Sequence, residues 1–336
     1  MSCTGYSIHR CVYDVYGLSL SVATNSKAVA RVVDSVLAPF SAVFRESTET
    51  WDVVIARGEL AKKVSCPAGM RQFWSGTFRD GSRMVYWTGE GVHQLDVFGL
   101  ASTFIDIPSR RAKITVREGK EWYIAGGPLL SVLSEFLRAV GHHIVHAASI
   151  VCIKNGENQG ILIAGGGGKG KTTTALALSG AGMKLLADDI TFVTNDSENG
   201  LFIWGLQKAC KVHHKTLEML TWLQDLPQRP AIRADEVFVD VSEPFGCTHS
   251  IQVEPKMIIF LDDRNMKEHC INPLNKVDAI KKLAGENVRA FDSNARGAIG
   301  ETFRVFGLLV GQCDCYLLSA GPNVTSLHKI FTGLLR

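Results

Sequence analysis

Several features that mark membrane, secreted and nucleic-acid-binding proteins are missing from this sequence of 336 residues. It has no apolar run as long as a transmembrane helix, and polar Ser2, Thr4, Ser7 and His9 stand where a signal peptide has its apolar core. The 36 basic residues are balanced by 33 acidic ones and form no sustained run, so the formal net charge is only +3. We therefore expect a cytoplasmic protein with no membrane segment and no nucleic-acid partner.

The sequence also lacks a C-x-x-C pair, although it contains nine cysteines. An odd, scattered set without paired spacing indicates reduced thiols rather than a disulfide framework or a zinc site. Cys313 and Cys315 are two residues apart in an apolar stretch, so we expect both on one face of a strand, packed in the core. The full set is Cys3, Cys11, Cys66, Cys152, Cys210, Cys247, Cys270, Cys313 and Cys315.

Internal repeats, low-complexity tracts and long linkers are absent as well. With 46% hydrophobic and 21% charged residues, the chain can bury a substantial core as two domains or one elaborated α/β unit. Residues 1–140 contain short alternating runs such as 51–55, which predict a β-rich α+β domain. Residues 141–336 form the second predicted domain.

Local signals place several elements in the first domain. Helical spacing of apolar residues predicts a helix over 28–37, and another from Pro128 to Gly141. The Asp80-Gly81 pair between two alternating runs predicts a hairpin. This domain therefore combines helices with hairpin-linked strands.

A glycine-rich segment is the most informative feature of the second domain. Residues 165–172 read Gly-Gly-Gly-Gly-Lys-Gly-Lys-Thr, a full G-x-x-x-x-G-K-[ST] pattern between an expected strand (161–164) and an expected helix (171–178). Glycines let backbone N–H groups wrap a polyphosphate, Lys171 reaches the terminal phosphates, and Thr172 can bind Mg²⁺. For Lys169, contact with phosphate and exposure to solvent stay equally open. The predicted nucleotide-binding residues are Gly165, Gly166, Gly167, Gly168, Lys169, Gly170, Lys171, Thr172 and Thr173.

The elements around this segment are mostly extended. We expect a hairpin of 147–153 and 161–164 around a polar turn at 154–160, and further strands at 184–187, 190–193 and 201–204. An ordinary phosphate-loop enzyme alternates strands with crossover helices. In this chain we expect only one such crossover.

Asp188 and Asp189 follow the hydrophobic strand 184–187, one short helix after Lys171. If that strand packs beside the loop strand, one carboxylate, assigned to Asp188, completes the Mg²⁺ shell with Thr172. The other, assigned to Asp189, accepts a proton from an incoming hydroxyl. The alternative is a turn in which the acids cap backbone N–H groups.

Two further residues are candidates for chemistry. Asp262, in a second acidic pair with Asp263 after the apolar run 257–261, is a rival to Asp188 for the metal. His146 opens the strand before the hairpin and could act near the phosphates as a donor or proton relay, although a lone histidine there is more often structural.

The order of His146, hairpin, G-G-G-G-K-G-K-T, short helix and L-L-A-D-D-I resembles the HPr kinase/phosphorylase family and its HPr-kinase-like relatives, including kinases of peptide-biosynthesis clusters. The resemblance covers residues 146–190. It implies a phosphate-loop fold akin to phosphoenolpyruvate carboxykinase, with His146, Lys171 and Asp189 in the catalytic centre and Thr172 as a magnesium ligand. Residues 204–210 lack the E-x-R-G-x-G segment of genuine HPr kinases, which counts against HPr as substrate and against the reverse phosphorylase reaction.

The leading hypothesis is a Mg²⁺-dependent kinase that transfers the γ-phosphoryl group of ATP to a hydroxyl, of serine type, on a peptide, protein or small molecule. A catalytically inactive nucleotide-binding regulatory or scaffold protein is the first alternative. An ordinary phosphate-loop enzyme that uses Asp262 in place of Asp188 is the second. The sequence leaves the acceptor and any homo-oligomeric state open.

Overall fold

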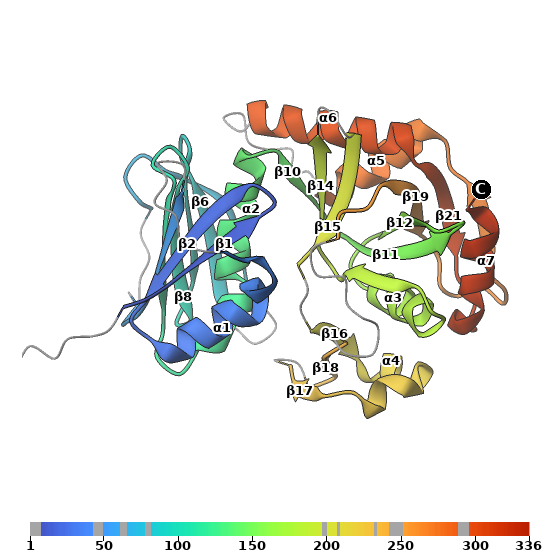
Figure 1. Ribbon diagram of the computed structural model, residues 1–336, viewed down its shortest axis with the longest axis horizontal. Coiled ribbons are helices and arrows are strands. Elements are labelled where there is room, and N and C mark those ends of the chain that lie inside the picture. The colour runs from blue at the N-terminus through green and yellow to red at the C-terminus, as the bar shows by residue number, and fades with distance from the viewer. Residues whose placement is uncertain are drawn as a thin grey trace, which may run out of the picture. The chain divides into compact units, whose positions relative to one another are not determined.

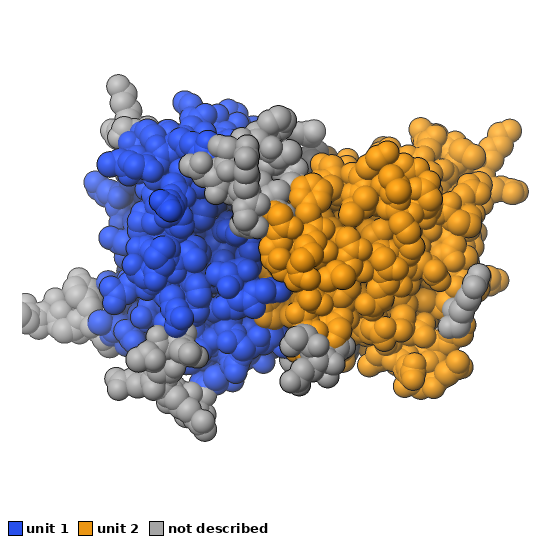
Figure 2. Space-filling model, turned by 90° about the horizontal axis from the view of Figure 1, so that it is seen from above, with its two compact units in different colours: residues 1–141 blue, residues 142–336 orange. Residues whose placement is uncertain are grey.

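The computed structural model describes most of the chain as two compact units, residues 1–141 and 142–336 (Figure 2). The described residues are 8–42, 50–60, 66–77, 82–196, 200–206, 209–231, 234–241, 251–287 and 296–335, with the side chains of 296–299 left aside. Asp80 and Gly81, the expected hairpin turn, lie outside this part, although the strands on either side of them pair antiparallel from Thr77 and Arg83 onward.

The first unit is built on one twisted sheet with the order β3-β1-β2-β4-β9-β8-β7-β6-β5. Neighbouring strands are antiparallel except where β4 pairs in parallel with β2 and β9. Its elements are β1 (His9–Val15), β2 (Leu18–Thr24), α1 (Lys27–Leu37), β3 (Ser41–Ala42), β4 (Trp51–Arg57), β5 (Arg71–Thr77), β6 (Arg83–Thr88), β7 (Val92–Val97), β8 (Ala101–Asp106), β9 (Arg111–Val116) and α2 (Pro128–Ala139), with 3₁₀ turns at Ala38–Phe40 and Glu121–Gly126.

Both helices predicted for this unit are present, and each buries one apolar stripe. Val29, Val33 and Leu37 of α1 are fully or almost fully buried, as is the α2 face that contains Phe136. The ring of Phe136 lies 4.5 Å from that of Trp51 on β4, centroid to centroid. The helices therefore form the core of this unit against the sheet.

The second unit contains three sheets, so the protein is a mixed α/β protein with several sheets (Figure 1). Its elements are β10 (His142–Val145), β11 (Ala147–Lys154), β12 (Glu157–Ala164), α3 (Lys171–Gly180), β13 (Lys184–Ala187), β14 (Thr191–Asp196), β15 (Gly200–Gly205), β16 (Cys210–His213), α4 (His214–Met219), β17 (Gln228–Pro230), β18 (Glu236–Val239), β19 (Pro255–Leu261), β20 (Cys270–Pro273), α5 (Lys276–Asn287), α6 (Arg296–Gln312), β21 (Asp314–Ser319) and α7 (Leu327–Leu334), with 3₁₀ turns at Thr221–Asp225 and Val324–Ser326.

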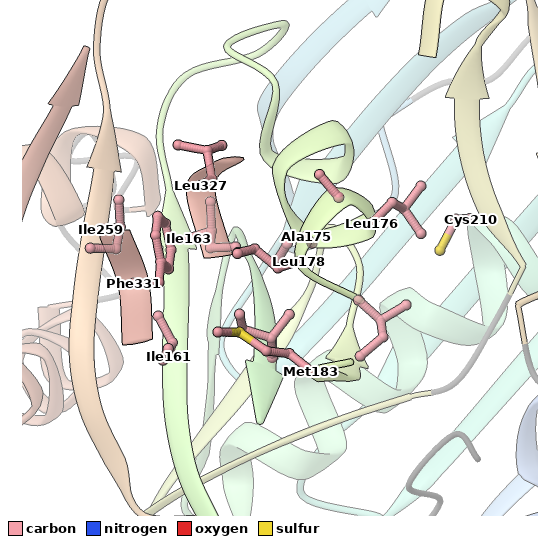
Figure 3. Close-up of a cluster of buried hydrophobic side chains, with 14 of the residues drawn as sticks. Ile161, Ile163, Ala175, Leu176, Leu178, Met183, Cys210, Ile259, Leu327 and Phe331 are labelled. Carbon is pink, nitrogen blue, oxygen red and sulfur yellow. The ribbon is translucent and has the colours of Figure 1, made fainter. Parts of the chain in front are cut away.

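The central sheet has the order β13-β11-β12-β19-β21-β20. Side chains alternate along its strands: Ile161 and Ile163 of β12 face α3 and α7, whereas Leu162 belongs to a second core cluster with α5 and α6. Figure 3 shows the first cluster, in which Leu327 and Phe331 of α7 lie with Leu178 of α3 over β12 and β19. The sheet is thus covered on both faces, which explains its long apolar strands.

Two expectations about this topology are wrong. The acid-bearing strand β13 does not lie beside the loop strand β12, because β11 pairs antiparallel with both and separates them. The strand beside β12 is β19, in parallel register. A second crossover also exists, since β19 and β21 are parallel neighbours joined through α5 and α6.

The hairpin of β11 and β12 is tighter than expected. Its turn consists of Asn155 and Gly156 alone, both with positive φ (54° and 83°), and the strands pair up to Lys154 and Glu157. Positive φ at both central residues is typical of the hairpin turn that Asn-Gly favours. The tight turn fixes β12 opposite β11 up to Ala147 and Ala164, next to the glycine-rich segment.

Cys313 and Cys315 are buried free thiols in the second core cluster, as expected. Only Cys315 lies on a strand, however, because Cys313 falls between α6 and β21. Burial raises the pKa of both thiols, which keeps them protonated and unreactive. Within the described residues, no helix is both long and apolar enough to cross a bilayer.

Candidate functional site

The glycine-rich segment forms a loop between the end of β12 and the start of α3. Gly168 and Gly170 have φ values of 76° and 100°, in the left-handed region that glycine adopts without strain. Gly165 packs closely against β19, since a Cβ on it would lie 3.2 Å from the carbonyl oxygen of Leu261. Gly167, Gly168 and Lys169 are exposed, so the middle of the loop is open to a ligand.

Lys171, the first residue of α3, folds back over this loop. Its Nζ donates a hydrogen bond of 2.7 Å to the carbonyl oxygen of Gly165, and the residue is 7% exposed. Burial lowers the pKa of this ammonium, while the carboxylates of Asp189, Glu286 and Asp188 act in the opposite direction. A buried cation at a helix N-terminus is suited to an anionic ligand.

Thr172 connects the loop to the acidic doublet. Its Oγ1 donates a hydrogen bond of 2.8 Å to Oδ1 of Asp188, a buried carboxylate at the end of β13. The two predicted metal ligands thus lie together, although β11 separates β12, which leads to the loop, from β13. The next residue, Thr173, directs its hydroxyl elsewhere, since its Oγ1 lies 3.0 Å from Oγ1 of Thr216 in α4.

Asp189 occupies an unusual backbone conformation. Its φ is 70°, and the N–H of Ile190 donates a hydrogen bond of 2.8 Å to the carbonyl of Asp188, which closes a γ-turn around Asp189. A non-glycine residue in this region is strained, and such strain is concentrated at functional sites. The turn leaves the Asp189 side chain 54% exposed at the carboxyl edge of the sheet.

His146 is the partner of this exposed acid. It stands between β10 and β11, and because β11 is antiparallel to β12, its position lies at the same edge as the loop. Its Nε2 is 3.0 Å from Oδ1 of Asp189. The structure therefore brings together His146, Lys171, Thr172, Asp188 and Asp189, from three separate segments of the second unit.

Asp262 and Asp263, the second acidic pair, follow β19, the strand beside the loop strand β12. Asp263 forms a turn, since its Oδ1 accepts the N–H of Asn265 at 3.0 Å, which fits the interpretation of this pair as a plain turn. Asp262 is half-buried at the carboxyl end of β19. Its carboxylate is not among those that raise the pKa of Lys171.

Three residues near the loop were not anticipated from the sequence. A Cβ on Gly170 would lie 3.6 Å from Cδ of Arg264, and one on Gly166 would lie 3.3 Å from Oε1 of Glu286. Oδ1 of Asn287 accepts the main-chain N–H of His146 at 2.5 Å. The last two residues end α5, a helix that was not predicted. Its start is capped by Oδ1 of Asn275, which accepts the N–H of Asp278, and an Asn before a helix is a signal that could have indicated it.

Thr172 Oγ1 and Asp188 Oδ1 are the oxygen atoms of the site that are suited to a hard cation such as Mg²⁺. Among the described residues, no three His, Cys, Asp or Glu side chains gather as a complete metal site. Mg²⁺ does not need such a cluster, because it is usually held by one or two protein oxygens together with phosphates and water. Adjacent ligands in its octahedral shell are about 2.9 Å apart, and the 2.8 Å between Thr172 Oγ1 and Asp188 Oδ1 fits that spacing.

Comparisons with known proteins do not assign this chain to a family. No protein-family model matches the chain, and no curated protein matches it. Among solved structures, the Hpr(Ser) kinase/phosphatase from Coxiella burnetii is similar over 36% of this chain and 66% of that chain, with 21% identity and a TM-score of 0.23. The similarity spans slightly less than two thirds of that structure and is too low to assign a family or an activity.

Proposed function

We propose that the protein is a kinase that binds MgATP at the loop of residues 165–173 and transfers the γ-phosphoryl group to a hydroxyl. The observation that carries this proposal is the hydrogen bond of 2.8 Å between Thr172 and Asp188. It fixes the acidic doublet at the N-terminus of α3, where a phosphate would bind. The resemblance of residues 146–190 to HPr-kinase-like proteins supports the same reaction.

The groups on the loop account for binding and for stabilisation of charge. Backbone N–H groups of Gly165–Thr173 and the ammonium of Lys171 would contact the phosphates and stabilise the charge that develops during transfer. Thr172 and Asp188 would hold the Mg²⁺ that enters with ATP, and that ion would neutralise phosphate charge. Lys171 is held near the phosphate site by the carbonyl of Gly165, so little reorganisation is needed.

Asp189 is the proposed general base. Its carboxylate is exposed, and a carboxylate can take the proton of an attacking hydroxyl. His146 contacts Oδ1 of Asp189 and would orient the base toward the acceptor. A serine-type hydroxyl on a peptide, protein or small molecule is the proposed acceptor class.

The test is transfer of labelled phosphate from ATP to a panel of serine peptides, proteins and small alcohols. Loss of a general base lowers transfer by about 10²- to 10⁴-fold. We expect this loss for Asp189→Asn, with the Kd for ATP within twofold of the wild type. Asp262→Asn is the matched control and should keep transfer within threefold.

Three outcomes would contradict the proposal. Unchanged turnover of Asp189→Asn would remove the proposed base. ATP binding without labelling of any acceptor would favour a nucleotide-binding scaffold. Loss of metal binding in Asp262→Ala but not in Asp188→Ala would favour an ordinary phosphate-loop arrangement.

A further inference from the structure

The C-terminal end of α5 contacts two parts of the site with consecutive residues. Glu286 approaches the loop at Gly166, as the 3.3 Å separation of its Oε1 from a Cβ built there shows. Asn287 accepts the main-chain N–H of His146 through its Oδ1 at 2.5 Å. Neither residue belongs to the phosphate loop or to the acidic doublet, and neither has a role in the proposed reaction so far.

The orientation of the Asn287 amide follows from its second hydrogen bond. Its Nδ2 donates to the carbonyl oxygen of Leu283, one helical turn earlier, at 2.7 Å. Oδ1 is therefore the atom that faces His146. Leu283 is 1% exposed and packs in the core beneath the central sheet, so the amide is attached to a firmly packed part of α5.

The N–H of His146 needs a partner outside the sheets. β10 pairs with β14 from His142 to Val145, and β11 pairs with β12 from Ala147 onward, so His146 falls between the two ladders. A partly buried main-chain donor without a ladder partner is normally satisfied by a side chain or water. Asn287 supplies that acceptor and thereby fixes the backbone of His146.

The contact between the side chains of His146 and Asp189 is too weak to fix their positions by itself. The two side chains are 38% and 54% exposed, and an exposed ion pair contributes little energy. The backbone on each side therefore contributes to their positions. The γ-turn closed by Ile190 anchors Asp189, and Asn287 anchors His146.

From these contacts we propose that Asn287 is a positioning residue, which holds the His146 main chain so that the imidazole keeps Asp189 at the phosphate site. This role rests on the proposed function. Asn287 touches neither substrate nor reacting atoms and acts through His146 alone. Its effect must therefore disappear when the imidazole is removed.

A double-mutant cycle tests this dependence. Loss of one hydrogen bond weakens an interaction by about 0.5–1.5 kcal/mol, which corresponds to about 2- to 12-fold. We expect Asn287→Leu, of similar volume but without an acceptor, to lower kcat by about that factor with the KM for ATP within twofold. In a His146→Ala background, Asn287→Leu should cause no further loss. Lys282→Ala, on the exposed face of α5, is the control and should leave kcat unchanged.

A measurement without nucleotide separates this proposal from the proposed function. In the NMR spectrum of the free protein, Asn287→Leu should move the ring-proton shifts of His146 toward those seen in Asp189→Asn, whether or not the wild type transfers phosphate. Additive losses in the cycle, or unchanged His146 shifts, would overturn the positioning role. If Asn287→Leu does not fold, Asn287→Ser, whose hydroxyl is too short to reach His146, enters the same two experiments.

Discussion

Each unit of the protein holds a charged side chain whose pKa is affected by burial, and the two side chains, Glu135 and Lys171, differ in their partners. In the first unit, Glu135 of α2 lies beside Arg138, accepts a hydrogen bond of 3.2 Å from the Tyr86 hydroxyl, and is 3.6 Å from Nε2 of His93. In the second unit, the ammonium of Lys171 donates to the neutral carbonyl of Gly165. One charge is enclosed by complementary groups, whereas the other donates to a main-chain carbonyl of the glycine-rich loop, which we propose binds phosphate.

The pKa directions follow from this difference. Burial alone would raise the pKa of Glu135, but the charges of Arg138 and His93 outweigh it and lower that pKa. For Lys171, burial dominates over the nearby carboxylates and lowers the pKa of the ammonium. A satisfied network indicates structural stabilisation, and a buried cation with a lowered pKa is a candidate for ligand binding.

The largest expected effect is on nucleotide binding and transfer by Lys171→Met. Loss of one preorganised donor to a transferring phosphate costs about 10²- to 10³-fold in kcat/KM. The same change should raise the melting temperature of the ligand-free protein, because the cost of burying the charged form is present at neutral pH and is lost as the pH rises through the lowered folded-state pKa toward 10.5. Steady-state kinetics and calorimetry check the two effects.

Lys267→Met, in the exposed segment after β19, is the control and should change neither quantity. Lys169→Met decides whether the second loop lysine contacts phosphate or only solvent. If Lys171→Met transferred phosphate at the wild-type rate, the cation of this residue would have no part in the reaction.

In the first unit, the corresponding substitution should act on stability. Glu135→Ala leaves Tyr86, His93 and Arg138 without their common partner, and breaking such a partly buried network costs about 2 kcal/mol. We expect this loss in the free energy of unfolding by urea, with ATP affinity unchanged where the protein is folded. Glu118→Ala, which breaks an exposed ion pair with Arg57, should cost less than about 0.5 kcal/mol. Equal losses of unfolding free energy in Glu135→Ala and Glu118→Ala would show that Glu135 contributes no more to stability than an exposed ion pair does.

The smallest expected effect is a pH dependence that arises from His93. Burial lowers the pKa of this imidazole, Arg138 lowers it further, and Glu135 acts against them; Tyr86 and Thr88 are its other polar neighbours. The folded state therefore binds the proton less readily than the unfolded chain. Stability should fall as the pH drops below 6.5, by at most about 1.4 kcal/mol per pH unit.

Thermal unfolding between pH 8 and pH 5 measures this slope. His93→Gln removes the titrating group and should flatten it. An unchanged slope in His93→Gln would assign the pH dependence to another group.

Much of the site could be predicted from the sequence, because its parts are local. The loop of residues 165–172 has a strict pattern, and a short helix brings Asp188 back near Thr172 whatever the order of strands. The order itself was predicted incorrectly, because apolar periodicity shows which face a strand buries but not which strand lies beside it. The insertion of β11 between β12 and β13 is a long-range choice of this kind.

The contribution of α5 was missed for a different reason. Only Ala279 and Leu283 are buried on this helix, so its apolar pattern is weak. The following α6 contains Gly297, Gly300, Gly307 and Gly311, which disfavour a helix in isolation. Tertiary packing in the second core cluster stabilises both helices. Only the structure shows that the last residue of α5, Asn287, contacts the main chain of His146.

The central claim is that Thr172 and the acidic doublet form one site with the phosphate loop. A crystal structure with Mn²⁺ and the β,γ-imido analogue of ATP tests it most directly, since the anomalous signal of manganese locates the metal. The account predicts the metal about 2 Å from Thr172 Oγ1 and Asp188 Oδ1, with the γ-phosphate between Lys171 and Asp189. A metal bound by Asp262 instead, or a nucleotide bound away from residues 165–173, would contradict it.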